Sequence, residues 1–320
     1  MTGRADLPGD RRTIVTVGTF DGVHRGHQAV LAEIVRRARG TGRASVLVTF
    51  EPHPLTVVAP ERAPCLLTSP AEKRLLWPLF ELDYVQVLPF TPKLRETSPE
   101  TFVREILVER LRVGELVIGY DHGFGKNRAG DVGVLRRLGE IEGFAVDVVG
   151  PVTGSGGEAI SSSVARRAVA AGDFDAVAEA LGRPYSVLGR VEPGAGRGRG
   201  LGFPTANLRL DHPDKCLPPD GVYAVRMELD GEALPGAAHL GPVPTFDDPR
   251  RRLEVHLLDW DGGALYGARP AVEFVERLRP IERYPDAPAL VRQMERDARA
   301  AHEALARAPR WSDPALRRIL

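Results

Sequence analysis

The sequence predicts a protein of two domains, a parallel α/β sheet followed by an antiparallel β-barrel with a terminal helix. Its 320 residues are long for a single hydrophobic core. Short apolar runs alternate with helical patterns from Thr13 to about Pro151. After Gly182-Arg183-Pro184 the pattern changes to short alternating runs separated by glycine and proline. We therefore expect one domain over residues 13–182 and a second over residues 183–308.

The first domain is expected to be a parallel sheet covered by helices on both faces, because strand and helix alternate. Such a fold holds ligands at the carboxyl ends of its strands. The expected strands are Ile14–Val17, Ser45–Phe50, Tyr84–Leu88, Leu116–Ile118 and Ala145–Val149. The expected helices are Ala29–Arg39, Ala71–Phe80, Pro99–Arg112 and Val132–Glu142.

The second domain is expected to be a closed or nearly closed barrel, preceded by two short helices over Ala159–Leu181 that break at Gly172. The expected barrel strands are Tyr185–Val191, Gly221–Leu229, Gly236–Leu240, Leu253–Leu258 and Ala271–Arg279. A stripe of apolar residues at helical spacing predicts a last helix that lies against the barrel. Its members are Leu290, Val291, Met294, Ala298, Ala301 and Leu305.

Composition excludes several partners. Lys plus Arg and Asp plus Glu number 43 each, so no global field would attract nucleic acid or an anionic membrane. Met1–Arg12 is polar and lacks the apolar core of a signal peptide, and no apolar run is long enough to span a membrane. Two distant cysteines, Cys65 and Cys216, predict reduced thiols and a cytoplasmic setting. We expect small-molecule substrates, with no nucleic acid and no membrane, and self-association is left open.

The segment Gly18–His27, GTFDGVHRGH, follows the first expected strand and leads into a helix. Backbone N–H groups at such a helix start bind phosphate well. His24 and His27 lie at the same end, where an imidazole can offset charge on a phosphate oxygen as a bond to it breaks. The alternatives are a satisfied loop pair or an incidental metal site, which the strand, glycines and helix disfavour. The pattern resembles the nucleotidyltransferase superfamily, which implies transfer of an AMP or CMP group from a nucleoside triphosphate onto a phosphate or carboxylate without a covalent enzyme intermediate.

Three further segments follow expected strands or open a helix. Glu51–Pro54, EPHP, is either a rigid turn or a loop that brings His53 to a ligand. Gly119–Gly125, GYDHGFG, combines a carboxylate with aromatic residues and precedes two cations. In Ile160–Arg166, ISSSVAR, the serines are either N-caps or, with Arg166, ligands for a triphosphate.

These segments, in this order, resemble the adenylyltransferase half of the bacterial bifunctional riboflavin kinase/FMN adenylyltransferase family. The resemblance implies a Rossmann-like nucleotidyltransferase domain in which His24 and His27 contact the triphosphate and Asp121 lies near the nucleotide or flavin. It implies phosphate binding by Ser162, Ser163 and Arg166. The turn residues Gly18, Phe20, Asp21 and Gly26 are expected to border the nucleotide. The chain departs from the family pattern at His122, Gly123, Ser163 and Ala165.

The run Gly194–Asn207, GAGRGRGLGFPTAN, is the second informative segment. Glycines let a backbone wrap phosphates, and a hydroxyl and an amide two residues apart on an extended strand face the same side. With ATP phosphates, Thr205 and Asn207 could complete a magnesium shell. A purely structural turn and a flexible nucleic-acid-binding tract are the alternatives. In the strand EVHLLD, Glu254 could take a proton from an attacking hydroxyl or could simply be exposed.

Five segments resemble the riboflavin kinase domain of the same family. They are this glycine-rich run, Gly221–Tyr223, Pro244-Thr245-Phe246, the EVHLLD strand and Leu265-Tyr266-Gly267. The resemblance implies that Thr205 and Asn207 bind magnesium and ATP, and that Glu254 is the base for the ribityl 5′-hydroxyl. It also implies that Gly196, Arg197 and Gly202 frame the nucleotide. His239 stands where the family has asparagine.

The sequence therefore predicts a transferase that converts riboflavin and ATP to FMN, and FMN and ATP to FAD with release of pyrophosphate. Mg²⁺ would bridge phosphate oxygens in both steps, ATP is the co-substrate, and the flavins are substrates or products. Two alternatives stay open. One is a riboflavin kinase whose first domain is weakly active or takes another acceptor. The other is a non-enzymatic flavin- or RNA-binding regulator, which the neutral net charge disfavours.

Overall fold

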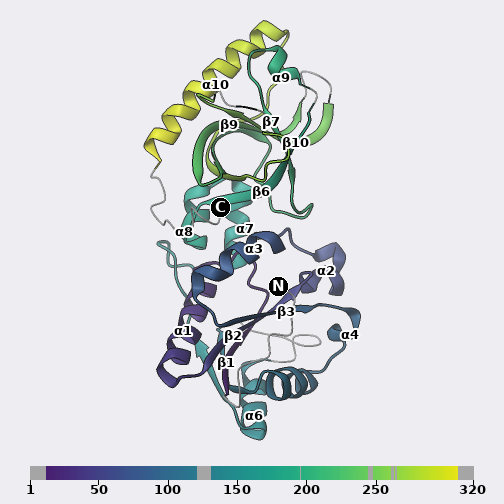
Figure 1. Ribbon diagram of the computed structural model, residues 1–320, viewed down its shortest axis with the longest axis vertical. Coiled ribbons are helices and arrows are strands. Elements are labelled where there is room, and N and C mark those ends of the chain that lie inside the picture. Colours follow the sequence, from purple (N-terminus) through teal and green to yellow (C-terminus); the bar gives the residue numbers. More distant parts are fainter. Residues whose placement is uncertain are drawn as a thin grey trace. The chain divides into compact units, whose positions relative to one another are not determined.

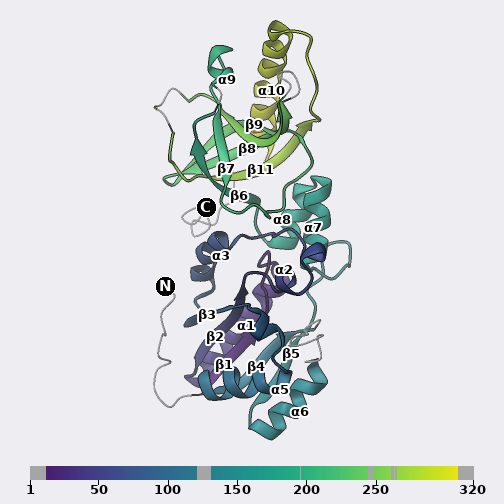
Figure 2. The same cartoon turned by 90° about the vertical axis from the view of Figure 1, so that its right-hand side faces the viewer.

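A computed structural model describes residues 12–120, 131–194, 196–243, 248–260, 263 and 265–308. The chain forms two compact units (Figures 1 and 2). The first comprises Met1–Cys65 and Leu76–Ser162, and the second comprises Leu66–Leu75 and Ser163–Leu320. The short segment Leu66–Leu75 therefore packs with the second unit although the sequence places it inside the first.

The first unit contains a sheet of five parallel strands in the order β3-β2-β1-β4-β5, which confirms the predicted parallel sheet (Figure 2). Its strands are β1 (Thr13–Val17), β2 (Ala44–Glu51), β3 (Tyr84–Pro89), β4 (Val113–Gly119) and β5 (Ala145–Val149). Every residue of β1 is buried, as expected for a central strand covered on both faces. From β1 the chain adds β2 and then β3 on one side, and β4 and then β5 on the other side. The direction in which strands are added thus reverses between β1 and β4, and ligands bind at such a switch point in open α/β sheets.

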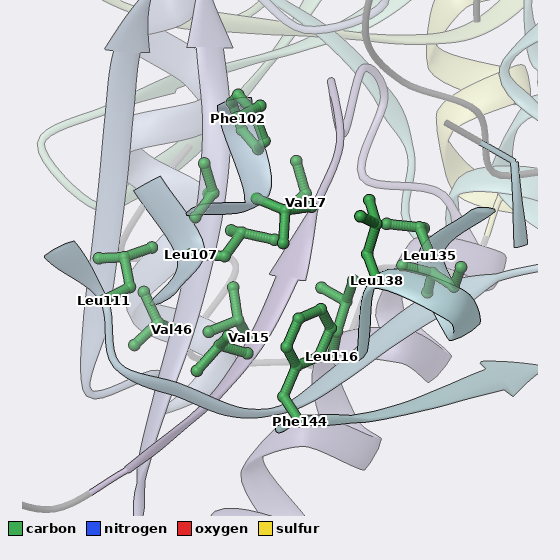
Figure 3. Close-up of a cluster of buried hydrophobic side chains, with 14 of the residues drawn as sticks. Val15, Val17, Val46, Phe102, Leu107, Leu111, Leu116, Leu135, Leu138 and Phe144 are labelled. Atoms are coloured by element: carbon green, nitrogen blue, oxygen red, sulfur yellow. The ribbon is translucent and has the colours of Figure 1, made fainter. Parts of the chain in front are cut away.

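Helices cover both faces of this sheet. On one face α1 contacts β1, β2 and β4 through an apolar stripe that includes Leu31 and Ile34. The other face packs against η3 and α6, where Val15, Val17 and Leu116 of the sheet meet Leu107 and Leu135 of the helices (Figure 3). The helical segments are α1 (Arg25–Thr41), α2 (Pro54–Val58), η1 (Pro60–Arg62), α3 (Pro70–Leu76), η2 (Trp77–Phe80), α4 (Pro92–Arg95), α5 (Pro99–Phe102), η3 (Val103–Arg110) and α6 (Val132–Glu142).

Two expected helices are divided in the structure. The helix expected over Ala71–Phe80 is α3 followed by the 3₁₀ turn η2, which starts at Trp77 and Pro78. The helix expected over Pro99–Arg112 continues from α5 into the wider π-helical segment η3. Pro78 has no N–H to donate, so the first of these two helices is interrupted there.

Arg37 of α1 fixes that helix to the sheet. Its guanidinium donates to Glu33 at 2.7 Å within the helix, and also to Glu115 of β4 and Asp147 of β5. The hydrogen bond from Arg37 lowers the pKa of Asp147. The ion pairs join the helix to the two strands on one side of the sheet.

The second unit opens with α7 (Ser162–Ala171, of which Ser162 still belongs to the first unit) and α8 (Phe174–Leu181), separated at Gly172 as predicted. The strands that follow close into a barrel in the order β10-β7-β6-β11-β8-β9, and all their pairings are antiparallel. They are β6 (Tyr185–Glu192), β7 (Ala206–Leu210), β8 (Gly221–Leu229), β9 (Glu232–Val243), β10 (Asp248–Leu257) and β11 (Ala271–Arg279). Between β6 and β7 lies the short helix α9 (Arg197–Gly200). The predicted barrel is confirmed, and β7 is a strand that was not among those expected.

The last helix, α10 (Ala287–Arg307), lies along the barrel as predicted (Figure 1). It contacts β8, β9 and β11, and its Ala301 and Ala304 are buried against Ala224 and Leu258. Because α10 covers β8, eight of the nine residues of that strand are buried, whereas β6 alternates between buried and more exposed positions. At the helix end, Arg226 donates to the carbonyls of Leu305 and Ala308.

The segment Leu66–Leu75 is held in the second unit by a buried ion pair. The Nζ of Lys215 lies 2.6 Å from Oε2 of Glu72, and the two side chains are 3% and 6% exposed. The other carboxylate oxygen of Glu72 accepts from the backbone N–H of Leu188 in β6 at 3.1 Å. Beside the ion pair, Leu66 N donates to Asp214 O and Cys216 N donates to Leu66 O.

The prediction of reduced thiols is wrong for this structure, in which Cys65 and Cys216 are both disulfide-bonded. The two cysteines are separated by 150 residues in the sequence. Such pairing leaves no signal in the spacing of the cysteines. Among the helices that the structure describes, none is long and apolar enough to cross a membrane.

Candidate active sites

The loop between β1 and α1 has an unusual backbone. Phe20 and Val23 adopt positive φ angles of 48° and 42°, and Gly22 between them has a φ of 84°. A β-branched residue at positive φ is strained, and strain of this kind occurs mostly at functional sites. A Cβ on Gly18 would lie 2.9 Å from Cε2 of Phe20, so a side chain at position 18 would have to displace the Phe20 ring.

The two predicted catalytic histidines meet at the first turn of α1. His24 is the N-cap of the helix, and its Nδ1 accepts from the backbone N–H of His27 at 3.4 Å. The two rings stack with centroids 3.6 Å apart, and His27 also lies 4.8 Å from the ring of Phe20. A Cβ on Gly26 would lie 3.1 Å from the ring of His24, so this glycine makes room for the imidazole. The first turn carries no acidic residue, which leaves the positive end of the helix dipole available to an anion.

A segment distant in sequence reaches the same loop. The hydroxyl of Ser162 donates to the backbone carbonyl of Asp21 at 2.9 Å, which places the start of α7 against the β1–α1 loop. Ser163 and Arg166 follow on α7 inside the second unit, and their place in the site stays a prediction. Asp121, together with His122 and Gly123, lies outside the described residues.

His53 is the N-cap of α2, where its Nδ1 accepts from the N–H of Leu55 at 3.2 Å. This capping role favours the rigid-turn interpretation of the Pro-His-Pro segment. The incidental-metal interpretation of His24 and His27 gains no support, because the described residues contain no group of three or more His, Cys, Asp or Glu side chains that could hold a metal ion.

A second site lies in the barrel, at a pocket whose empty space, open mouth included, is about 980 Å³. The glycine-rich run supplies one side of it, from Gly196 to Asn207, and β10 supplies another. Gly196 and Gly202 both have positive φ angles, 69° and 85°, which glycine adopts without strain. The backbone of Arg197 lies in α9, but its side chain is not among those described.

The predicted trio of oxygen-bearing side chains meets in this pocket. In the antiparallel pairing of β10 with β7, Glu254 lies opposite Asn207. The hydroxyl of Thr205 donates to Oε2 of Glu254 at 3.4 Å, and all three side chains line the pocket. Glu254 is therefore half-buried beside its partners and is not a fully exposed strand residue. Hydroxyl, amide and carboxylate oxygens are the donors that Mg²⁺ prefers, so this set fits the implied metal.

Two glycines of the run are required by close packing. A Cβ on Gly194 would lie 2.2 Å from Nδ2 of Asn207, and a Cβ on Gly198 would lie 2.3 Å from the carbonyl oxygen of Phe203. Side chains at these positions would displace Asn207 or the segment that leads to Thr205. These close approaches argue against a flexible tract.

Sequence reasoning missed several polar residues of the pocket. Arg252, Glu254 and His256 alternate along β10 and all line the pocket, so the polar face indicated by the alternation in EVHLLD extends to Arg252. His239, a departure from the family pattern, lies opposite Glu254 in the pairing of β9 with β10, and its Nε2 is 2.8 Å from the carbonyl oxygen of Pro242. Its contact with the pocket could not be read from β9 alone.

Arg279 and Asp297 form a two-pronged ion pair at another wall of the pocket, with N–O distances of 2.8 and 2.6 Å. Burial lowers the pKa of Arg279, but the hydrogen bonds and charge of Asp297 outweigh it and raise the pKa overall. The pair joins the end of β11 to α10, so it fixes the helix that closes this wall.

Comparison with known proteins gives a consistent result. A family model described as FAD synthetase matches residues 7–164, and one described as riboflavin kinase matches residues 181–305. Curated bifunctional riboflavin kinase/FMN adenylyltransferases are similar over nearly the whole chain. The protein of Pseudomonas fluorescens is 41% identical, with coverage of 92% of this chain and 93% of the relative. That of Escherichia coli K12 is 37% identical, with coverage of 91% and 92%.

The relative in Bacillus subtilis is 32% identical and covers 91% of this chain and 92% of its own length. Among solved structures, a chain from Streptococcus pneumoniae described as a macrolide-efflux protein matches with a TM-score of 0.81 at 27% identity. The match covers 94% of this chain and 97% of that one, so the two share the order of their domains.

Proposed function

The chain belongs to the bifunctional riboflavin kinase/FMN adenylyltransferase family, and from this premise we propose which of its residues carry each reaction. It is a transferase that phosphorylates riboflavin to FMN and adenylylates FMN to FAD. We assign the adenylyltransferase reaction to residues 13–182 and the kinase reaction to residues 183–308. One observation supports the kinase assignment above the others, namely the meeting of Thr205, Asn207 and Glu254 in a single pocket.

In the kinase reaction, Glu254 accepts the proton of the ribityl 5′-hydroxyl as its oxygen attacks the γ-phosphorus of ATP. The bond from that phosphorus to the bridging oxygen breaks, and ADP leaves. Thr205 and Asn207 would hold Mg²⁺, which, when bound, offsets the negative charge of the phosphate oxygens. The glycines of the run allow its backbone N–H groups to approach the phosphates closely, with Gly196 on the pocket wall.

In the adenylyltransferase reaction, a phosphate oxygen of FMN attacks the α-phosphorus of a second ATP, and pyrophosphate leaves. His24 and His27 lie at the start of α1, where imidazole groups and the positive end of the helix dipole together offset charge on the triphosphate. Gly18, Phe20, Asp21 and Gly26 shape this loop, and Ser162 joins it through Asp21. We propose Ser163, Arg166 and Asp121 as further phosphate or nucleotide ligands. No covalent intermediate is needed, because alignment and charge stabilisation suffice.

The test is chromatography of riboflavin incubated with the purified protein, ATP and Mg²⁺. FMN should form first and FAD should follow, and supplied FMN should give FAD and pyrophosphate without riboflavin. FMN that accumulates with no FAD from either route would instead identify a kinase whose first domain takes another acceptor. Absence of both products would overturn the proposal. Family membership decides against a non-enzymatic regulator, while the cytoplasmic setting stays a prediction.

A further inference from the structure

His256 makes two contacts with the segment that delivers Thr205 to the kinase pocket. Its Nδ1 lies 2.9 Å from the carbonyl oxygen of Pro204. Its ring meets the ring of Phe203 edge-on, with centroids 5.1 Å apart. The histidine lines the pocket, two residues beyond Glu254 on the same face of β10.

The hydrogen bond defines the protonation of the ring. A carbonyl oxygen can only accept, so Nδ1 of His256 carries a hydrogen and donates it. This donor is present in the neutral Nδ1-H tautomer and in the doubly protonated ring alike. The contact with Pro204 is thus insensitive to protonation at Nε2.

The hydrogen bond between His256 and Pro204 lies just beyond the end of the pairing of β10 with β7. The described register of β10 with β7 runs from the pair Leu253 and Leu208 to the pair Val255 and Ala206. Its ladder therefore ends one residue short of Thr205. The side chain of His256 joins β10 to the same segment beyond that point, at the residue before Thr205. The strand that carries Glu254 is in this way tied to the backbone on both sides of Thr205.

We propose that His256 is a positioning residue for phosphoryl transfer, which holds Thr205 at its place beside Glu254 through the Pro204 carbonyl and the Phe203 ring. This inference rests on the kinase function proposed for the barrel. The Thr205 hydroxyl lies 3.4 Å from the Glu254 carboxylate, a separation that a shift of the Phe203–Thr205 backbone would change directly. Catalytic groups tolerate displacements of only a fraction of an ångström before rates fall.

Two substitutions separate the hydrogen bond from packing. His256→Asn keeps an N–H group on the γ-carbon, where Nδ1 of the histidine stands, but loses most of the ring. His256→Phe keeps a ring against Phe203 but has no donor. We expect His256→Phe to lower kcat for FMN formation, or the apparent Mg²⁺ affinity, about tenfold to a hundredfold, the range typical when a partner that orients a ligand is lost. His256→Asn should recover most of this loss.

A second readout needs neither metal nor turnover. Hydrogen exchange of the peptide that contains residues 203–207, measured in metal-free protein, should be faster in His256→Phe than in wild type and near normal in His256→Asn. The pH profile of FMN formation should keep its shape in His256→Asn, because the proposed role involves no proton transfer. Loss of one limb of the profile would identify His256 as an acid or base and overturn the positioning role.

Two controls keep the outcomes distinct. His302→Phe changes a histidine on α10 that pairs with Asp259 at 3.2 Å on the surface, and it should leave FMN formation unchanged. FAD formation from supplied FMN should be unaffected in every variant, since that reaction uses the other site. If wild type makes FMN and His256→Phe matches it in rate and exchange, the inference fails while the kinase function stands. If wild type makes no FMN, the proposed function itself fails.

Discussion

Replacing Lys215 by methionine should destabilise the barrel unit more than any surface substitution. Lys215 and Glu72 are 3% and 6% exposed, and their charged atoms are 2.6 Å apart. The ammonium group also donates to the carbonyl of Leu67 at 2.6 Å and lies 4.7 Å from the centre of the Tyr185 ring. Lys215→Met removes these contacts and leaves the Glu72 carboxylate buried without its cation.

The expected cost follows from that unpaired carboxylate. Breaking one partner of a buried ion pair costs about 3 to 5 kcal/mol. For a unit of this size, each kcal/mol lowers the midpoint of thermal unfolding by about 2 to 4 °C, so the shift should be roughly 6 to 20 °C. Removing both charges in Glu72→Gln/Lys215→Met should recover much of the loss, because a neutral pair does not pay the cost of burying one charge.

Differential scanning calorimetry measures these midpoints. Arg307→Met is the matched control. Arg307 pairs with Glu276 at an N–O distance of 3.2 Å, and the two side chains are 64% and 48% exposed. Exposed pairs contribute about 0 to 1 kcal/mol, so the control should shift the midpoint by no more than a few degrees. A Lys215→Met midpoint no lower than that of the control would refute the reasoning. So would a double variant as unstable as the single one.

Two further predictions concern one position in each unit. Gly194→Ala should slow FMN formation at least about tenfold, because the methyl group of the alanine would displace Asn207. Conversion of FMN to FAD should stay intact, and a steady-state assay of each half-reaction checks both expectations. Hydrogen bonds from Arg36 and then Arg37 lower the pKa of Glu33 to about 2, below its ordinary value of 4.5. The resulting stabilisation is present above pH 4.5 and is lost as pH falls through about 2. Between pH 5 and 3 the free energy of unfolding, measured by denaturant titration, should therefore fall less in Glu33→Gln than in wild type. An equal fall of the unfolding free energy with pH in the two proteins would contradict this prediction.

Local patterns predicted most of the fold. The helical stripe of α10 and the break at Gly172 were predicted because each depends on residues near one another in the chain. β7 was not counted as a strand, because Ala206–Leu210 is short and continues a glycine-rich run. The place of Leu66–Leu75 in the barrel unit could not be predicted, since only the buried pairing of Glu72 with Lys215 reveals it.

The candidate sites show the same division. The proximity of His24 and His27 follows from their three-residue spacing at a helix start and was predicted, whereas the stacking of their rings is seen only in the structure. The approach of Glu254 to Thr205 depends on the register of β10 against β7, which no local pattern specifies. His256 alternates visibly with Glu254, but its partner is a backbone carbonyl 52 residues away, and a carbonyl has no residue-specific signal.

The separation of the two reactions between two sites is tested most directly by time courses of FMN and FAD in two single variants supplied with riboflavin, ATP and Mg²⁺. His27→Ala should accumulate FMN at the wild-type rate and form little FAD. Glu254→Gln should form little FMN, a loss of about a hundredfold to ten-thousandfold for a general base, yet convert supplied FMN to FAD normally. If either substitution abolished both reactions in protein that remains folded, the two chemistries would share one site, and the assignment of one reaction to residues 13–182 and the other to residues 183–308 would be wrong.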